Sequence, residues 1–122
     1  MCNSTTVNSI RIDCVTFDAR DPDLLSGWWA RLLAAEVEVD EVDVDHFWVR
    51  GAGPTLLFMQ TANAKTSKNR IHLDLVAEDV SVEVDKALAL GATRATGVLA
   101  GPFPWTVLHD PEGNEFCICP AQ

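Results

Sequence analysis

Residues 14–17 read Cys14-Val15-Thr16-Phe17 and are followed by Asp21, whereas residues 72–75 read His72-Leu73-Asp74-Leu75 and are followed by Asp79. The shift along the chain that carries Cys14 onto His72 also carries Asp21 onto Asp79. Each stretch joins a strand-like run to a residue that can cap a helix, and a constant shift between two such stretches indicates an internal repeat. We therefore expect a chain of two similar halves.

The same shift places Glu115-Phe116-Cys117 on Leu57-Phe58-Met59, which extends the predicted repeat to the last strand of each half. Each half then has the order strand, helix, strand, strand, strand. The expected strands cover residues 10–18, 37–45 (acidic, with a bulge), 46–50 and 55–61 in the first half and 70–77, 93–99, 103–109 and 115–119 in the second.

Helix boundaries follow from residues that favour helix ends. Asp21 and Asp79 are predicted N-caps, and the helices are expected to end near Ala34 and Gly91. We predict one domain of the α+β class. It covers residues 9–120, with a first module over 9–61, a polar linker over 62–69 and a second module over 70–120.

Composition limits the partners. The chain has 122 residues, of which 48% are hydrophobic, and a net charge of −9, so a folded domain that repels phosphate backbones and anionic lipid is expected. No apolar run approaches the ~20 residues of a membrane span, and the first residues do not read as a signal peptide. We expect a cytoplasmic protein with no nucleic-acid or membrane partner. Its four cysteines form no CxxC pair and are expected to be reduced.

Three segments of this pattern resemble the vicinal oxygen chelate superfamily, in particular its glyoxalase-like group: residues 68–75, 90–93 and 110–116. This superfamily includes glyoxalases, extradiol dioxygenases, fosfomycin-resistance enzymes and bleomycin-binding proteins. The resemblance covers roughly residues 9–120. It implies two tandem βαβββ modules that form a curved mixed sheet around a cleft. Members of the family commonly dimerise, so a homodimer is expected.

Alternation along the strands sorts the side chains into two faces. If Leu73 and Leu75 pack on the helix, His72 and Asp74 face the opposite side. The same reasoning turns Glu115 and Cys117 away from the helix, together with the matching residues of the first half. The candidate ligand-binding residues are Cys14, Thr16, Trp48, Leu57, Met59, Asp74, Trp105 and Cys117, and the candidate catalytic residues are His72 and Glu115.

The resemblance implies that four positions facing the cleft would hold a divalent metal, here Cys14, Leu57, His72 and Glu115. The imidazole and the carboxylate are ordinary ligands of zinc, iron, manganese or nickel. Leucine cannot coordinate, and cysteine stands where many members have histidine. We expect no metal cofactor. The alternative is one divalent metal held by Cys14, His72 and Glu115 with an open coordination position.

Several functions are compatible with this pattern. The leading hypothesis is a small-molecule binding protein that sequesters a metabolite or an antibiotic, with Trp48 and Trp105 stacking on the ligand. One alternative is a metal-dependent lyase, isomerase or oxygenase that uses His72 and Glu115. Others are a metal-free acid/base enzyme of secondary metabolism and a scaffold whose pocket is filled by side chains.

Overall fold

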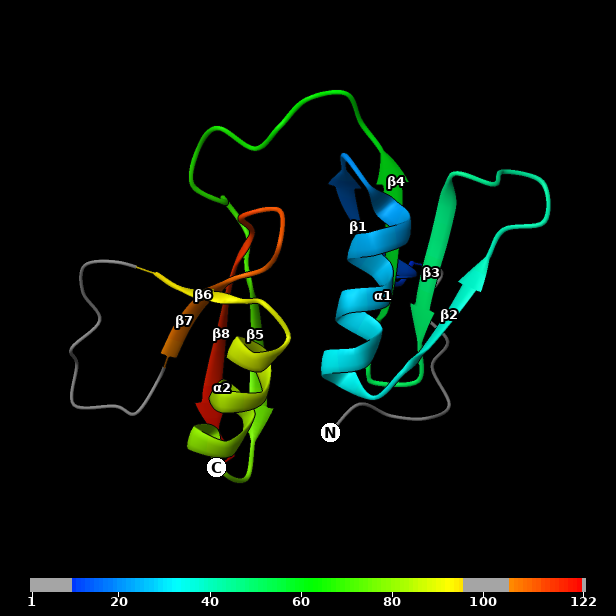
Figure 1. Cartoon of the computed structure of the whole chain (residues 1–122). Coiled ribbons are helices and arrows are strands. Elements are labelled where there is room, and N and C mark those ends of the chain that lie inside the picture. Colours follow the sequence, from blue (N-terminus) through cyan, green and yellow to red (C-terminus); the bar gives the residue numbers. More distant parts are fainter. Residues whose placement is uncertain (1–9, 96–105, 122) are drawn as a thin grey trace, which may run out of the picture.

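The computed structural model describes residues 10–95 and 106–121 (Figure 1). The first module contains β1 (Cys14–Ala19), α1 (Pro22–Leu33), β2 (Glu36–Val39), β3 (His46–Arg50) and β4 (Thr55–Gln60). The second contains β5 (Leu73–Ala77), α2 (Val80–Ala89), β6 (Thr93–Arg94), β7 (Thr106–His109) and β8 (Glu115–Pro120). This order confirms the predicted α+β fold of two βαβββ modules.

The strands form two four-stranded mixed sheets with equivalent strand orders, β1-β4-β3-β2 and β5-β8-β7-β6. In each sheet the first strand of the module pairs in parallel with the last, and the remaining neighbours are antiparallel. Figure 1 shows the two modules side by side, with the linker between β4 and β5 arching across one end of the molecule.

Both helices begin where the capping residues predict. The Asp21 carboxylate accepts a hydrogen bond from the Leu24 amide at 3.1 Å, and Asp79 accepts one from the Val82 amide at 3.2 Å. Gly91 follows α2 with φ of +111°, a left-handed conformation that costs glycine little. The two N-caps, Asp21 and Asp79, thus make equivalent hydrogen bonds, as the repeat requires.

The last strands do not follow the shift that relates the first strands and the helices. Cys14 pairs with Thr55 in the first sheet, and Leu73 pairs with Phe116 in the second, which sets His72 opposite Glu115. The structural counterpart of Glu115 is therefore Thr55 rather than Leu57. This slip by two positions leaves every side chain on its predicted face, because strands alternate with a period of two.

The predicted acidic strand 37–45 is shorter in the structure. β2 ends at Val39, and Asp40 then accepts hydrogen bonds from the amides of Val42 and Asp43 at 2.8 and 3.0 Å. The hydrogen bonds from the backbone amides of Asp43 and Val42 hold the pKa of the Asp40 carboxyl below its ordinary value. This local turn gives the backbone amides of Val42 and Asp43 a hydrogen-bond acceptor without a neighbouring strand. Residues 10–13 and 70–72 also lie outside strands.

One hydrophobic core joins the two modules. Trp28 and Trp29 of α1 are buried, as expected for a core stripe, and their rings lie 5.9 and 5.0 Å from the ring of Phe116 in β8. The Trp28 indole also donates to the Leu90 carbonyl at 2.9 Å. Burial of these large aromatic side chains provides a main share of the stability that holds the modules together.

The sheet faces opposite the helices carry a different set of side chains. Thr16, Leu57 and Trp48 are neighbours across the first sheet, and Asp74 and Cys117 are neighbours across the second. Leu57 is 8% exposed and Cys117 is 4% exposed, yet neither belongs to the core under the helices. We call these two surfaces the open faces.

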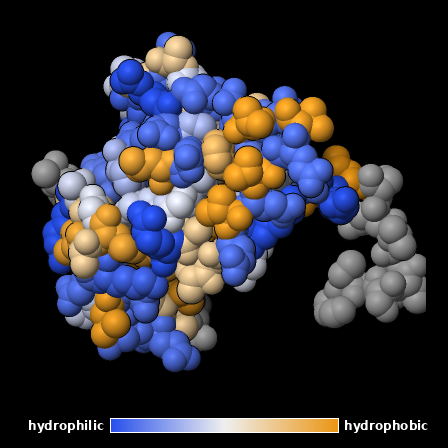
Figure 2. Space-filling model, turned by 45° about the vertical axis from the view of Figure 1, so that its right-hand side comes forward, coloured by the Kyte–Doolittle hydropathy of each residue, from blue (hydrophilic) through white to orange (hydrophobic). Residues whose placement is uncertain are grey.

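The face shown in Figure 2 is largely hydrophilic, with hydrophobic residues gathered in several patches. Val42 and Val44, which follow β2, are among the most exposed large hydrophobic side chains of the described residues. Within the same residues, no helix combines the length and the hydrophobicity needed to cross a membrane.

Candidate functional site

A cleft of about 590 Å³ lies between the edge of β1 and the residues that lead into β5, beneath the linker. Phe17 of β1 lines it as a half-buried side chain, and its ring packs on the core, where Trp29 of α1 and Phe116 of β8 are 0% and 1% exposed. The opposite wall is formed by the linker and by the turn before β8. This volume lies within the range of pockets that hold small organic ligands.

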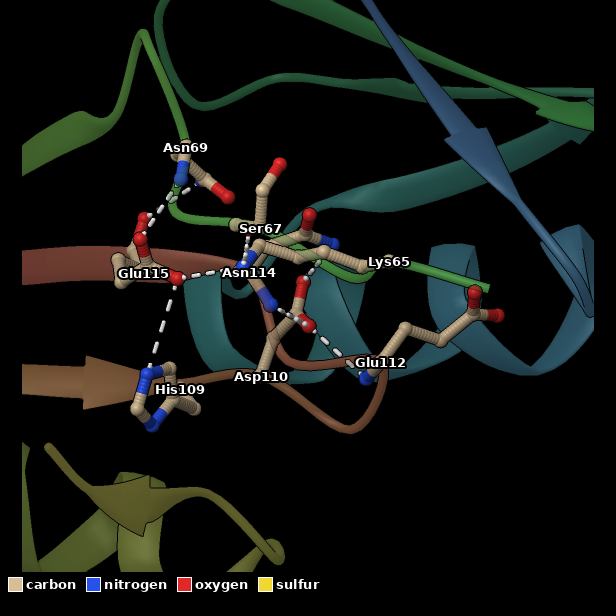
Figure 3. A network of polar contacts seen from close by, with 8 residues as sticks. All are labelled: Lys65, Ser67, Asn69, His109, Asp110, Glu112, Asn114 and Glu115. Atoms are coloured by element: carbon tan, nitrogen blue, oxygen red, sulfur yellow. Dashed lines mark hydrogen bonds and ion pairs between the residues drawn. The ribbon is translucent and has the colours of Figure 1, made fainter. Parts of the chain in front are cut away.

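Glu115 anchors the linker over the cleft (Figure 3). One carboxylate oxygen accepts the Asn69 amide at 2.8 Å, and the other lies 2.9 Å from the Lys65 ammonium and 3.7 Å from Nε2 of His109. Lys65 also donates to the Ser67 carbonyl, which closes the linker into a tight loop. Glu115 on β8 thus fixes the position of the linker, although the linker comes much earlier in the chain.

The electrostatics of Glu115 agree with this tether. Burial alone would raise the pKa of the Glu115 carboxyl, but the Asn69 amide, the Lys65 ammonium and the charge of His109 together lower it below its ordinary value of 4.5. The carboxylate is therefore ionised at neutral pH and stabilises the linker loop through a charge-assisted pair of contacts.

The turn from Asp110 to Asn114 forms the rim of the cleft. Asp110 is 4% exposed, and it accepts hydrogen bonds from the Glu112 and Asn114 amides, each at 2.9 Å. Its second oxygen accepts the Trp29 indole at 3.0 Å, which ties the turn to α1. The Glu112 carboxylate in turn accepts the Arg20 amide at 2.7 Å, so this turn also links the two modules.

Cations gather at the cleft in a chain that is strongly acidic overall. Lys65, Lys68 and Arg70 all line it, although the whole sequence has only 9 lysines and arginines. Lys65 is paired with Glu115, whereas Lys68 and Arg70 take part in no ion pair with any described residue. Lys65 and Lys68 fall in the predicted linker and Arg70 at the start of a predicted strand, and the close spacing of these three cations in an acidic chain was not used to predict the site.

The predicted site residues are divided between the cleft and the open faces. Thr16, His72 and Glu115 line the cleft. Cys14, Trp48, Leu57, Met59, Asp74 and Cys117 do not line it and lie on strands β1, β3, β4, β5 and β8, and Trp105 lies outside the described residues. The ring of Trp48 is covered by the Arg50 guanidinium at 4.8 Å, which stacks on it as a cation on an aromatic face.

The positions at which the resemblance implies a metal form a poor donor set. Both oxygens of Glu115 are engaged by the linker, and its first-module counterpart, Thr55, offers only a hydroxyl. The Cys14 thiol lies 3.8 Å from the Thr16 hydroxyl. Among the described residues, Cys14 shares no group of three potential ligands with His72 or Glu115.

A different group of potential metal ligands forms on the open face of the second sheet. One ligating atom each from His72, Asp74 and Cys117 lies within 4.8 Å of the others. Nε2 of His72 is 3.1 Å from the Asp74 carboxylate. Burial raises the pKa of the Cys117 thiol to about 11, and the neighbouring Asp74 carboxylate and Cys119 contribute to the rise. Burial also raises the pKa of Cys119.

Three solved structures show the same fold with low sequence identity. A hypothetical protein, SA1046 from S. aureus, has a TM-score of 0.74 at 12% identity, with 93% of this chain and 96% of that chain covered. A glyoxalase/bleomycin resistance protein/dioxygenase family enzyme from Burkholderia phytofirmans PsJN has a TM-score of 0.73 at 19% identity, with coverages of 90% and 98%.

The third structure is a mutant of the fosfomycin resistance protein FosX from Listeria monocytogenes in complex with Mn(II) and a dihydroxypropylphosphonic acid. Its TM-score is 0.72 at 14% identity, with 93% of this chain and 90% of that chain covered. No curated protein matches the sequence significantly. The sequence profile of the glyoxalase-like domain family, however, matches residues 14–119. Because this match spans nearly the whole chain, the protein belongs to the glyoxalase-like domain family of the vicinal oxygen chelate superfamily.

Proposed function

We propose that this protein binds a small organic anion in the cleft beneath the linker and thereby sequesters a metabolite or an antibiotic. The observation that carries the proposal is the pairing, in one cleft, of the half-buried Phe17 ring with two cations that have no ion-pair partner among the described residues. The two cations are Lys68 and Arg70, and the Phe17 ring packs on the buried Trp29. The function does not require the metal positions of the family.

The chemistry of the cleft favours a ligand with an apolar body and one negative group. Removal of a flat hydrocarbon surface from water is favourable by about 25 cal/mol per Å², and aromatic side chains add specific ring contacts. Lys68 and Arg70 would each contribute about 0.5–1 kcal/mol to an anion at a solvent-accessible edge.

The test uses 8-anilinonaphthalene-1-sulfonate, an aromatic anion whose fluorescence rises on binding, and its uncharged analogue N-phenyl-1-naphthylamine. Wild-type protein is expected to bind the sulfonate more tightly than the analogue. The double variant Lys68→Gln, Arg70→Gln should weaken sulfonate binding by about five- to thirtyfold, which corresponds to about 1–2 kcal/mol. Its binding of the uncharged analogue should change little.

A matched control removes two positive charges elsewhere. Arg11 and Arg94 are exposed and do not line the cleft, so Arg11→Gln, Arg94→Gln should leave sulfonate binding within about twofold of wild type. Equal losses in the two double variants would show that only net charge matters. Equal affinity of the wild type for both probes would also contradict the proposal.

A second candidate function is metal-free acid/base catalysis. His72 lines the cleft, and the Asp74 carboxylate at 3.1 Å from its Nε2 can orient the imidazole. This arrangement replaces the predicted pair of His72 and Glu115, since Glu115 is occupied by the linker. A screen for turnover of aromatic carboxylic acids would support it if His72→Ala abolished turnover while sulfonate binding persisted.

A homodimer remains a prediction from the family resemblance. Light scattering coupled to size-exclusion chromatography measures it directly.

A further inference from the structure

Three side chains with different ligating groups meet on the open face of the second sheet. Asp74 and Cys117 are paired neighbours on the parallel strands β5 and β8, which places their side chains next to each other on one face. His72 precedes Asp74 by two residues and joins that face immediately before β5 begins. Their ligating atoms lie within 4.8 Å of one another.

We propose that His72, Asp74 and Cys117 form a binding site for a divalent transition metal of the zinc type. An imidazole, a carboxylate and a thiolate are the usual ligand types of zinc, whereas calcium and magnesium prefer sites made only of oxygen. Tetrahedral zinc, with bonds of about 2.0–2.3 Å, requires its ligand atoms to be roughly 3.3–3.6 Å apart. Nε2 of His72 lies 3.1 Å from the Asp74 carboxylate, and all three ligating atoms lie within 4.8 Å of one another, which is close to this spacing.

The exposure of the group fits a metal site with an open position. The side chains of His72 and Asp74 are 42% and 54% exposed, whereas Cys117 is buried beneath them. Three protein ligands leave the fourth position of a tetrahedron to water or to a bound molecule. A cation can reach this site from solvent, and it would rest on a thiol held firmly in the sheet.

The local charges also favour a cation. Burial first, and then the Asp74 carboxylate and the neighbouring Cys119, disfavour a thiolate at Cys117, and a divalent cation bound to the sulfur would stabilise the thiolate. On binding, the S–H bond of Cys117 breaks, its electron pair forms the bond to the metal, and the proton passes to the buffer. Among the described residues, Lys68 is the nearby cation whose charge lowers the pKa of the Cys117 thiol.

The proposed site differs from the positions that the family resemblance implies. It shares His72 with them, but its other two ligands are Asp74 and Cys117 rather than Cys14 and Glu115. It does not rest on the proposed binding of an organic anion, because the metal would be held by three side chains of the second module and would need no ligand in the cleft. Each proposal can therefore fail without the other.

The experiment titrates the reduced full chain with cobalt(II) chloride, because cobalt bound to a thiolate gives a charge-transfer band in the near ultraviolet. Wild-type protein should reach one equivalent with this band, and zinc sulfate should displace the cobalt. Cys117→Ser should abolish the band. His72→Gln should weaken cobalt binding by at least about tenfold, and because His72 is exposed, this variant tests the site without risk to the core.

Two matched variants control for the other thiols among the described residues, those of Cys14 and Cys119. Cys14→Ser and Cys119→Ser remove the same group from other strand positions, and both should keep the band and the wild-type affinity. Loss of the band in Cys14→Ser would instead favour the ligand set implied by the family. The proposal is overturned by that result, by a band that survives in Cys117→Ser, by unchanged cobalt affinity in His72→Gln, or by the absence of cobalt uptake in wild-type protein.

Discussion

Asp110→Asn replaces a buried carboxylate by an amide of almost the same shape, and we predict that it strongly destabilises the fold. Each oxygen of Asp110 accepts two hydrogen bonds. Oδ1 accepts the amides of Glu112 and Asn114, each at 2.9 Å. Oδ2 accepts the Trp29 indole at 3.0 Å and the Asn114 side-chain amide at 2.9 Å.

The magnitude follows from these four contacts. Asparagine keeps one oxygen, which can replace Oδ1, but it turns an amino group toward the two donors that Oδ2 accepted. Hydrogen bonds to a charged group are worth about 1.5–3 kcal/mol each, so the loss of two lowers the free energy of unfolding by about 3–6 kcal/mol. A domain of this size typically has about 5–15 kcal/mol in total, so the variant should fold but with a much reduced margin.

The assay is urea unfolding followed by far-ultraviolet circular dichroism, because the altered contact to Trp29 would itself change the fluorescence. Asp79→Asn is the matched control, since it makes the same chemical change at the N-cap of α2. Asparagine caps a helix about as well as aspartate, so this control should lose no more than about 0.5 kcal/mol. Equal losses in the two variants, or a loss below about 1 kcal/mol in Asp110→Asn, would refute the reasoning.

Two further predictions concern stability. Because the pKa of Glu115 is lowered on folding, its contribution is fully present above its ordinary value of 4.5 and is lost as the pH falls through the folded-state value. Acid titration of the unfolding free energy should therefore be less steep for Glu115→Gln than for wild type, and identical slopes would count against the tether. Gly27→Ala should raise the free energy of unfolding by about 0.5–1 kcal/mol, since Gly27 lies within α1 and an added Cβ meets only the Arg31 side chain at 3.6 Å. Gly91→Ala should lower it by about 1 kcal/mol because of the positive φ, and thermal unfolding that ranks the two variants in the opposite order would contradict this argument.

Local rules were sufficient for the helices, and they located the first strand of each module although both predicted strands began three or four residues too early. Asp21 and Asp79 cap their helices with their own side chains, and both effects act within a few residues of the chain. One constant shift relates these elements because no insertion separates β1 from α1 or β5 from α2. The sequence was therefore enough to predict a repeated βαβββ fold.

The register of the last strands required long-range information. Leu57-Phe58-Met59 and Glu115-Phe116-Cys117 match in letters, yet Thr55 is the true counterpart of Glu115. A slip by two positions preserves the alternation of faces, so the hydrophobic pattern cannot detect it. The strand predicted over residues 37–45 was too long for a different reason. After Val39 the Asp40 side chain forms a turn that competes with strand pairing.

The candidate site was predicted only in part. His72, Thr16 and Glu115 do lie at the cleft, but Glu115 serves to hold the linker rather than to face an open cavity. That role depends on Lys65 and Asn69, which approach Glu115 only in the folded chain. Contacts of this kind leave no periodic signal in a sequence.

The place of the ligand can be measured directly by amide chemical shifts in a two-dimensional NMR titration with 8-anilinonaphthalene-1-sulfonate. We predict that the largest changes occur at the amides of residues 65–72 and of Glu115, and at the indole of Trp29, all of which border the cleft. Changes concentrated instead around Trp48 on the open face of the first sheet, or spread evenly over the molecule, would contradict the central claim that the cleft beneath the linker is the binding site.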